Sequence, residues 1–272
     1  MNNMKFELRP IYKVDREYFE SNPEVFKKIK ELNELFLNET YQGNKVAYLY
    51  KNIKTGDIIS FNEDICFYAA STIKAFICLM ILEKVSNKEL DLSTKYLIKM
   101  EDLKQDTGII KYQKEDTEYT LEELVKLSII ESDNTAYIKL VDILGGKEEV
   151  KKYGLSLGAT HTMEGKDSFG ILNCTDLLIY WETIKKFIDT NELGNMFKDY
   201  LINPSVKLID DKSINNKTFI RKYGSWDIAY HEAGYIEDEY YLIVLTQLNK
   251  KEYKNEFINK AASMINEIHE II

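Results

Sequence analysis

Segments with the pattern of β-strands lie near both ends of this chain, and segments with the pattern of helices lie between them. Residues 45–61 read as two strands joined by a turn, and residues 218–248 read as three more strands in succession. Amphipathic helices are predicted on the outer side of each group, over residues 24–37 and 256–272. We therefore expect one antiparallel five-stranded sheet, assembled from both ends of the chain and flanked by the terminal helices.

The residues between the two strand groups are expected to form an all-helical lobe. The predicted fold class is α/β, of the α+β type, in a single domain over residues 1–272. One lobe takes approximately residues 1–61 with 216–272, the other takes residues 62–215, and a cleft lies between them. With 44% hydrophobic residues among 272, the chain has enough apolar material for such a core.

Charge and composition exclude several classes of partner. The formal net charge is -9 and both signs of charge are interspersed, so no nucleic acid partner is expected. The longest apolar run, residues 75–82, is too short for a membrane segment, and residues 1–20 lack the apolar core of a secretion signal. We expect a cytoplasmic protein if the chain is complete, and a secreted or cell-surface protein if a signal or anchor was trimmed. Cys66, Cys78 and Cys174 are expected to be reduced.

The segment FYAASTIKAFICLMIL, residues 67–82, reads as a buried helix that carries Ser71 and Lys74. Residues three apart share one face of a helix, so these two side chains are expected to touch. Burial weakens the preference of a lysine for its charged form, which lets Lys74 accept a proton from the Ser71 hydroxyl. The alternative interpretation is structural: Ser71 caps the helix and Lys74 extends to solvent.

A second motif strengthens the catalytic interpretation. Ser132, Asp133 and Asn134 open an amphipathic helix, a place where all three residue types also serve as caps. A nucleophile built from Ser71 and Lys74 needs another hydroxyl for proton relay and an amide to hold the substrate. The SDN triplet supplies both.

A third element is expected to be a lysine and a glycine on a strand beside the cleft. The literal triplet KTG at 54–56 lies upstream of Ser71 in a hairpin turn, where it is ordinary turn chemistry. The triplet KYG at 222–224 follows Ser132 and lies on a predicted strand, so we select it. Alone, it would read as a surface strand with an exposed lysine.

The ordered set STIK, SDNTA and KYG resembles the motifs of the penicillin-recognising serine hydrolases, and specifically the class A β-lactamase-like family. The resemblance covers most of the chain from about Lys45 onward. It implies the β-lactamase/transpeptidase-like fold, acyl-enzyme chemistry and no cofactor. By this resemblance Ser71 is the acylated nucleophile and Lys74 its proton acceptor or relay, while Ser132 and Lys222 shuttle protons and set the local potential.

The resemblance also implies a set of substrate contacts. Asn134 would hold the substrate amide, and the backbone N–H groups of Ser71 and Ser225 would bind the oxyanion. Gly224 would let the strand approach the substrate closely. Tyr223 stands where the family has threonine or serine, so a bulky ring replaces the short hydroxyl that helps to bind a substrate carboxylate.

A larger departure concerns the loop at residues 158–176. Class A enzymes hydrolyse the acyl-enzyme with a water molecule activated by a glutamate in an ExxLN-like motif, and this loop is short and lacks that motif. ILN at 171–173 keeps part of it. Glu164 is the only glutamate in the loop and is a candidate for the deacylating base, against the alternative of a solvated loop carboxylate.

The remaining polar candidates are interpreted as structural. His231 and Glu232 are neighbours on a predicted strand and point to opposite faces, so at most one lines the cleft. We expect His231 to be a hydrogen-bonded structural histidine. His161 and His269 have no companions with metal-ligand spacing, so no metal is predicted.

Three functions follow from these residues. The first is a serine hydrolase acting on a β-lactam amide. The second is D-alanyl-D-alanine peptidase-like or esterase-like acyl transfer, with slow or no β-lactam turnover. The third is a non-catalytic relative that binds a ligand. The expected partner is a small-molecule substrate, either a β-lactam or a D-Ala-D-Ala-like peptide.

Overall fold

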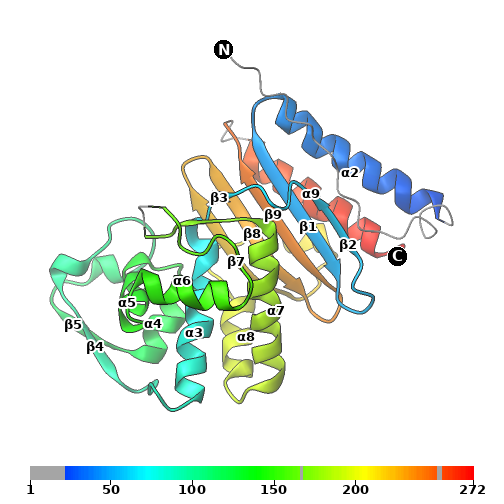
Figure 1. The fold of residues 1–272 in the computed structure, drawn as a ribbon. Coiled ribbons are helices and arrows are strands. Elements are labelled where there is room, and N and C mark those ends of the chain that lie inside the picture. The colour runs from blue at the N-terminus through cyan, green and yellow to red at the C-terminus, as the bar shows by residue number, and fades with distance from the viewer. Residues whose placement is uncertain (1–21, 166–167, 250–252) are drawn as a thin grey trace.

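A five-stranded antiparallel sheet forms the centre of the computed structural model, which describes residues 22–165, 168–249 and 253–272 (Figure 1). The strands lie in the order β2, β1, β9, β8, β7. Their bounds are β1 (Lys45–Asn52), β2 (Ile58–Phe61), β7 (Phe219–Trp226), β8 (Ala229–Ile236) and β9 (Tyr240–Gln247). β1 pairs with β9 along its whole length, so the predicted union of the early hairpin with the late strands is confirmed.

Helices cover both faces of this sheet. Figure 1 shows α2 (Pro23–Tyr41) and α9 (Lys254–His269) together on one face, with the helical part of the chain on the other. Along β1 the side chain of Tyr48 joins the core under α2 and α9, whereas that of Leu49 joins the core of the helical part. This alternation follows from strand geometry, in which successive side chains point to opposite faces. The predicted fold class is confirmed.

The helical part is built around one apolar helix, α3 (Lys74–Ser86), which is buried from Lys74 to Leu82. A helix that is apolar on all sides is stable only inside other elements. Its helical neighbours are α4 (Leu121–Ile130), α5 (Asn134–Ile143), α6 (Lys147–Ser156), α7 (Cys174–Thr190) and α8 (Gly194–Ile202). Two short sheets accompany them, β3 (Phe67–Tyr68) with β6 (Ile171–Leu172) and β4 (Lys95–Ile98) with β5 (Thr117–Thr120). The 3-10 turns are η1 (Ala70–Ile73), η2 (Met100–Asp102), η3 (Ile110–Tyr112) and η4 (Asp211–Ile214).

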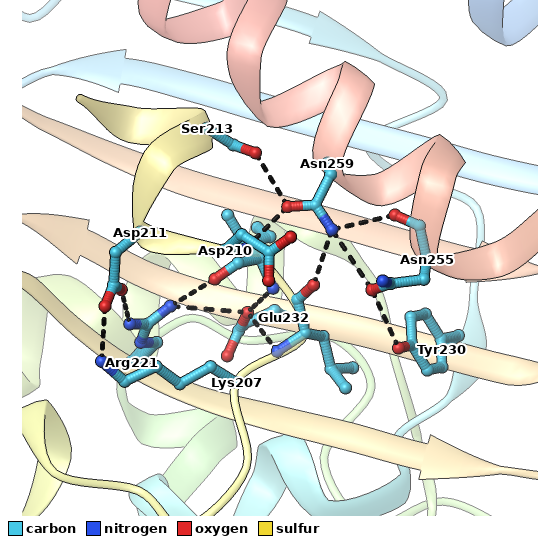
Figure 2. A network of polar contacts seen from close by, with 11 residues as sticks. Lys207, Asp210, Asp211, Ser213, Arg221, Tyr230, Glu232, Asn255 and Asn259 are labelled. Carbon is cyan, nitrogen blue, oxygen red and sulfur yellow. Dashed lines mark hydrogen bonds and ion pairs between the residues drawn. The ribbon is translucent and has the colours of Figure 1, made fainter. Parts of the chain in front are cut away.

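A buried polar network anchors the segment that leads from α8 to the edge strand β7 (Figure 2). Glu232 on β8 accepts hydrogen bonds from the backbone nitrogens of Leu208, at 3.2 Å, and Ile209, at 2.6 Å. Arg221 on β7 donates to the Ile209 carbonyl at 2.7 Å, and Asn259 on α9 donates to the Leu208 carbonyl at 2.9 Å. Burial raises the pKa of Glu232 to about 7, although the Arg221 charge acts in the opposite direction.

Two sequence expectations stay outside this description. Residues 1–21 lie outside the described residues, and they include the start of the predicted first lobe and the segment 1–20 that lacks the pattern of a secretion signal. The division into two lobes stays a prediction. Among the helices of the described ranges, none combines the length and apolar composition that a membrane span requires.

Candidate active site

Ser71 lies in a strained turn at the start of the apolar helix. The sequence predicts one continuous helix here, but the structure has the 3-10 turn η1 first and begins α3 at Lys74. Ala70, directly before Ser71, has a φ of 46°, a left-handed conformation that is costly for a residue with a Cβ. The turn leaves Ser71 at a pocket wall although only 7% of its surface is exposed.

Lys74 is fully buried and points to the SDN triplet. Its ammonium group donates to the Ser132 carbonyl, to the Asn134 side-chain oxygen at 2.6 Å and to the Ser132 hydroxyl at 3.2 Å. Burial, and then the charge of Lys222, hold the pKa of Lys74 well below its usual range. Within the part of the chain that the structure describes, no hydrogen bond joins Lys74 to the hydroxyl of Ser71, and the amine contacts Ser132 and Asn134 instead.

Ser132 connects the two buried lysines. Its hydroxyl accepts a hydrogen bond from Lys222 at 3.0 Å as well as from Lys74. Ser132 has a φ of 52°, so a second strained backbone position lies at this site. Burial lowers the pKa of Lys222 to about 7. One hydroxyl thus joins the two buried amines by hydrogen bonds.

Asp133, the middle residue of the SDN triplet, has the capping role that the sequence offered as an alternative, and a second structural role that it did not predict. One carboxylate oxygen caps α5 by accepting from the Ala136 nitrogen at 2.9 Å. The other accepts from the backbone nitrogens of Ile109, at 2.7 Å, and Ile110, at 2.8 Å. Gly108 fits against this carboxylate because a Cβ there would lie 2.1 Å from an Asp133 oxygen. Asp133 thus fixes the 105–110 loop beside the site.

Gly224 permits close contact between β7 and the turn that carries Ser71. A Cβ at position 224 would lie 3.0 Å from the backbone nitrogens of both Ser71 and Thr72. That separation is shorter than ordinary van der Waals contact, so only glycine fits without a shift of the backbone. The next residue, Ser225, lines the same pocket as Ser71. The oxyanion role of the backbone N–H groups of Ser71 and Ser225 stays a prediction.

Tyr223 does not line the pocket that Ser71 and Ser225 share. Its ring lies against the Lys222 ammonium group, 4.1 Å from nitrogen to ring centroid. Burial raises the pKa of its hydroxyl. The ring therefore covers Lys222, and its predicted role in substrate binding stays a prediction.

The pocket is open to solvent and has a cavity volume of about 70 Å³. Its lining combines the predicted residues Ser71, Asn134 and Ser225 with residues that the motif analysis did not select. The latter are Tyr68, Ala70, Asp106, Thr107, Phe169 and Trp226.

Glu164 lies away from these groups. Its carboxylate is 3.9 Å from the Lys151 amine on α6 and is 38% exposed. The ring that lines the pocket from this loop belongs to Phe169, which stacks on Tyr137 at 4.8 Å between centroids. The sequence contains an indication of this role. Residues 169–173 read FGILN, so Phe169 stands at the position that the ExxLN motif gives to glutamate.

His231 and Glu232 are both buried, and neither is in the pocket lining. His231 accepts a hydrogen bond from the Thr246 backbone nitrogen at its Nδ1, so its Nε2 carries the proton and donates to the Tyr68 carbonyl at 2.9 Å. Burial lowers the pKa of His231 to about 4. Over the described ranges, no group of three or more His, Cys, Asp or Glu side chains is placed to hold a metal ion.

Known proteins share this architecture. A model of the beta-lactamase enzyme family matches residues 26–269. The chain is 29% identical to beta-lactamase BRO-1 of Moraxella catarrhalis over an alignment of 244 residues. This alignment covers 86% of this chain and 75% of that protein.

Solved structures give the same result for the fold. An acyl-enzyme complex of a PBP-A mutant with penicillin G superposes with a TM-score of 0.81 at 19% identity, covering 91% of this chain and 97% of that one. A beta-lactamase of Sphaerobacter thermophilus superposes with a TM-score of 0.79 at 19% identity, covering 89% and 97%.

Proposed function

Because this chain belongs to the beta-lactamase enzyme family, we propose that it is a serine hydrolase that opens a β-lactam amide by acylation of Ser71. The observation that carries the proposal is the Ser132 hydroxyl, which accepts hydrogen bonds from the two buried amines of Lys74 and Lys222. This arrangement lies beside the pocket that Ser71 lines. A nucleophile, a proton acceptor and a relay to the leaving nitrogen are thus available at one place.

Acylation would proceed by attack of the Ser71 oxygen on the lactam carbonyl carbon. The hydroxyl proton passes to neutral Lys74, and the C–N bond of the ring breaks as Ser132 delivers a proton to the lactam nitrogen. Ser132 regains a proton from the lysine pair, so the proton balance closes. The developing oxyanion is bound by the backbone N–H groups of Ser71 and Ser225.

The Ser71 hydroxyl has to turn toward Lys74 for this step. Catalytic hydrogen bonds often form only when substrate is bound, so their absence without substrate is compatible with the mechanism. Lowering of the Lys74 pKa by burial favours the neutral amine that the step requires.

A specific observation also supports the second function, acyl transfer with slow release. Phe169 lines the pocket at the position that ExxLN assigns to the deacylating glutamate. A hydrocarbon ring cannot activate water, and the acyl-enzyme would then persist. The natural acyl donor would be a D-Ala-D-Ala-like peptide or an ester.

Intact mass measurement over time after mixing with benzylpenicillin tests the proposal. We expect an adduct of one penicillin per chain that decays over many minutes and is absent in Ser71→Ala. Rapid decay with release of hydrolysed penicillin would identify an efficient β-lactamase instead. No adduct and no hydrolysis would leave the third function, a non-catalytic relative that binds a ligand.

A further inference from the structure

The mouth of the pocket combines aromatic walls with a single charge. Tyr68, Phe169 and Trp226 supply rings to the lining, and Trp226 is 55% exposed. Among the residues that line this pocket, Asp106 alone has a charged side chain. Aromatic rings favour an apolar or aromatic group of a ligand, and a carboxylate favours a cation.

The position of Asp106 is fixed by the loop that carries it. The carbonyl of the next residue, Thr107, accepts a hydrogen bond from the Asn134 nitrogen at 2.9 Å. Two residues further, Asp133 holds the backbone nitrogens of Ile109 and Ile110. The loop is therefore tied to the SDN segment itself, and Asp106 keeps a constant place relative to Ser71.

The carboxylate of Asp106 is available to a ligand. Among the described residues it has no ion pair or side-chain hydrogen bond, whereas the Lys111 amine donates to the backbone carbonyl of Asp106. Lys74 and Lys222 lie deeper, are fully buried and have lowered pKa values. Asp106 therefore supplies the one charged side chain of the pocket lining, with the Lys111 amine on its backbone carbonyl and its charge acting on the deeper Lys74.

We propose that the pocket selects acyl donors whose acyl side chain carries an ammonium group beside an aromatic ring, with Asp106 as the specificity-determining residue. The ring packs among Tyr68, Phe169 and Trp226, and the ammonium group pairs with the Asp106 carboxylate. This inference rests on the proposed function, since it assigns a substrate class to the same site.

Ampicillin and benzylpenicillin form a matched pair for the test, because they differ by one amino group on an aromatic acyl side chain. The quantity to measure is the second-order acylation rate constant by intact mass, at a pH where that amine is protonated. We expect ampicillin to acylate the protein faster than benzylpenicillin, by up to about fivefold, the upper end of the range for an exposed ion pair. Asp106→Asn should abolish this ratio, and added salt should reduce it.

Glu115→Gln is the control, because it removes the same charge from an exposed residue outside the pocket lining. It should keep the preference for ampicillin. A ratio that is equal in the wild type and Asp106→Asn would overturn the inference while leaving acylation of Ser71 intact. Failure of both penicillins to acylate the protein would refute the proposed function and the inference together.

Discussion

The ammonium group of Lys74 lies 5.6 Å from the centroid of the Phe169 ring. The Tyr137 ring lies at the same distance, so the two stacked rings enclose this amine on the side of the 158–176 loop. Water that attacks an acyl-enzyme needs a base within hydrogen-bond reach. Among the described residues, the one that lines the pocket from this loop is Phe169, whose hydrocarbon ring cannot act as a base.

Phe169→Glu should accelerate deacylation. The carboxylate would enter the pocket near Lys74 and act as the general base that the wild-type ring cannot supply. General base catalysis typically contributes about 10²–10⁴-fold, and we expect steady-state benzylpenicillin hydrolysis to rise by at least about tenfold. Absorbance of the lactam ring measures the rate.

Phe169→Gln is the matched control, because it has nearly the shape of glutamate but cannot accept a proton at neutral pH. It should acylate and stay acylated. Equal hydrolysis by the Glu and Gln variants would show that space or polarity, rather than a base, limits deacylation.

Gly224→Ala should slow acylation by about 100-fold, the cost of losing an oxyanion donor. The new Cβ would lie 3.0 Å from the Ser71 nitrogen and displace either β7 or the turn. Gly224→Val should lower the rate further, because it adds bulk at the same contact. Both rates come from intact mass kinetics, with thermal melting as the check on folding. If both variants acylate at the wild-type rate, then close contact between β7 and the turn that carries Ser71 is not required for acylation.

Lys74→Met should reduce acylation by about 10²–10⁴-fold, because the side chain keeps its length but loses the amine that receives the Ser71 proton. The affinity for reversibly bound penicillin, measured by calorimetry, should change less than the acylation rate. If this variant acylates at the wild-type rate, then Ser132 with Lys222 is sufficient to activate Ser71.

Glu232→Gln should change how stability depends on pH. The folded pKa of Glu232 is about 7, above the ordinary value of 4.5, so between these values the folded state keeps a proton that the unfolded state has released. The contribution of Glu232 to the free energy of unfolding is therefore full below about pH 4.5 and is lost as pH rises through 7.

Urea unfolding at several pH values measures this effect. Relative to Glu232→Gln, the wild type should lose stability from pH 5 to pH 8. Parallel curves for the two proteins would contradict a buried, protonated Glu232.

The sequence predicted the sheet well because its signals are local and repeated. Short runs rich in apolar and aromatic residues identify strands in β1 and β9, and the apolar character of residues 75–82 identifies a buried helix. The union of the early hairpin with the late strands in one sheet was predicted, whereas the pairing of β1 with β9 was not.

The site was predicted less completely, because several of its contacts depend on tertiary structure. The resemblance to the three motifs of the family implied that Lys74, Ser132 and Lys222 lie together, and the structure joins them by hydrogen bonds. The periodicity of the segment did not reveal that a 3-10 turn would precede α3, or that Lys74 would donate to Ser132 and Asn134 rather than to Ser71. The direction of the Lys74 side chain depends on acceptors of Ser132 and Asn134, which lie far from Lys74 in the sequence.

Residues without a polar motif were also overlooked. Phe169 carries no chemistry of its own, and only its offset from Asn173 indicates its importance. Asp106 lies in a loop whose place beside the site depends on Asp133 and on the small size of Gly108.

Acylation of Ser71 is tested most directly by digestion of the penicillin-treated protein and tandem mass spectrometry of the peptide that spans residues 67–82. We predict that the penicilloyl group is found on Ser71. A group located on another residue, or penicillin hydrolysis that persists in Ser71→Ala, would contradict the account.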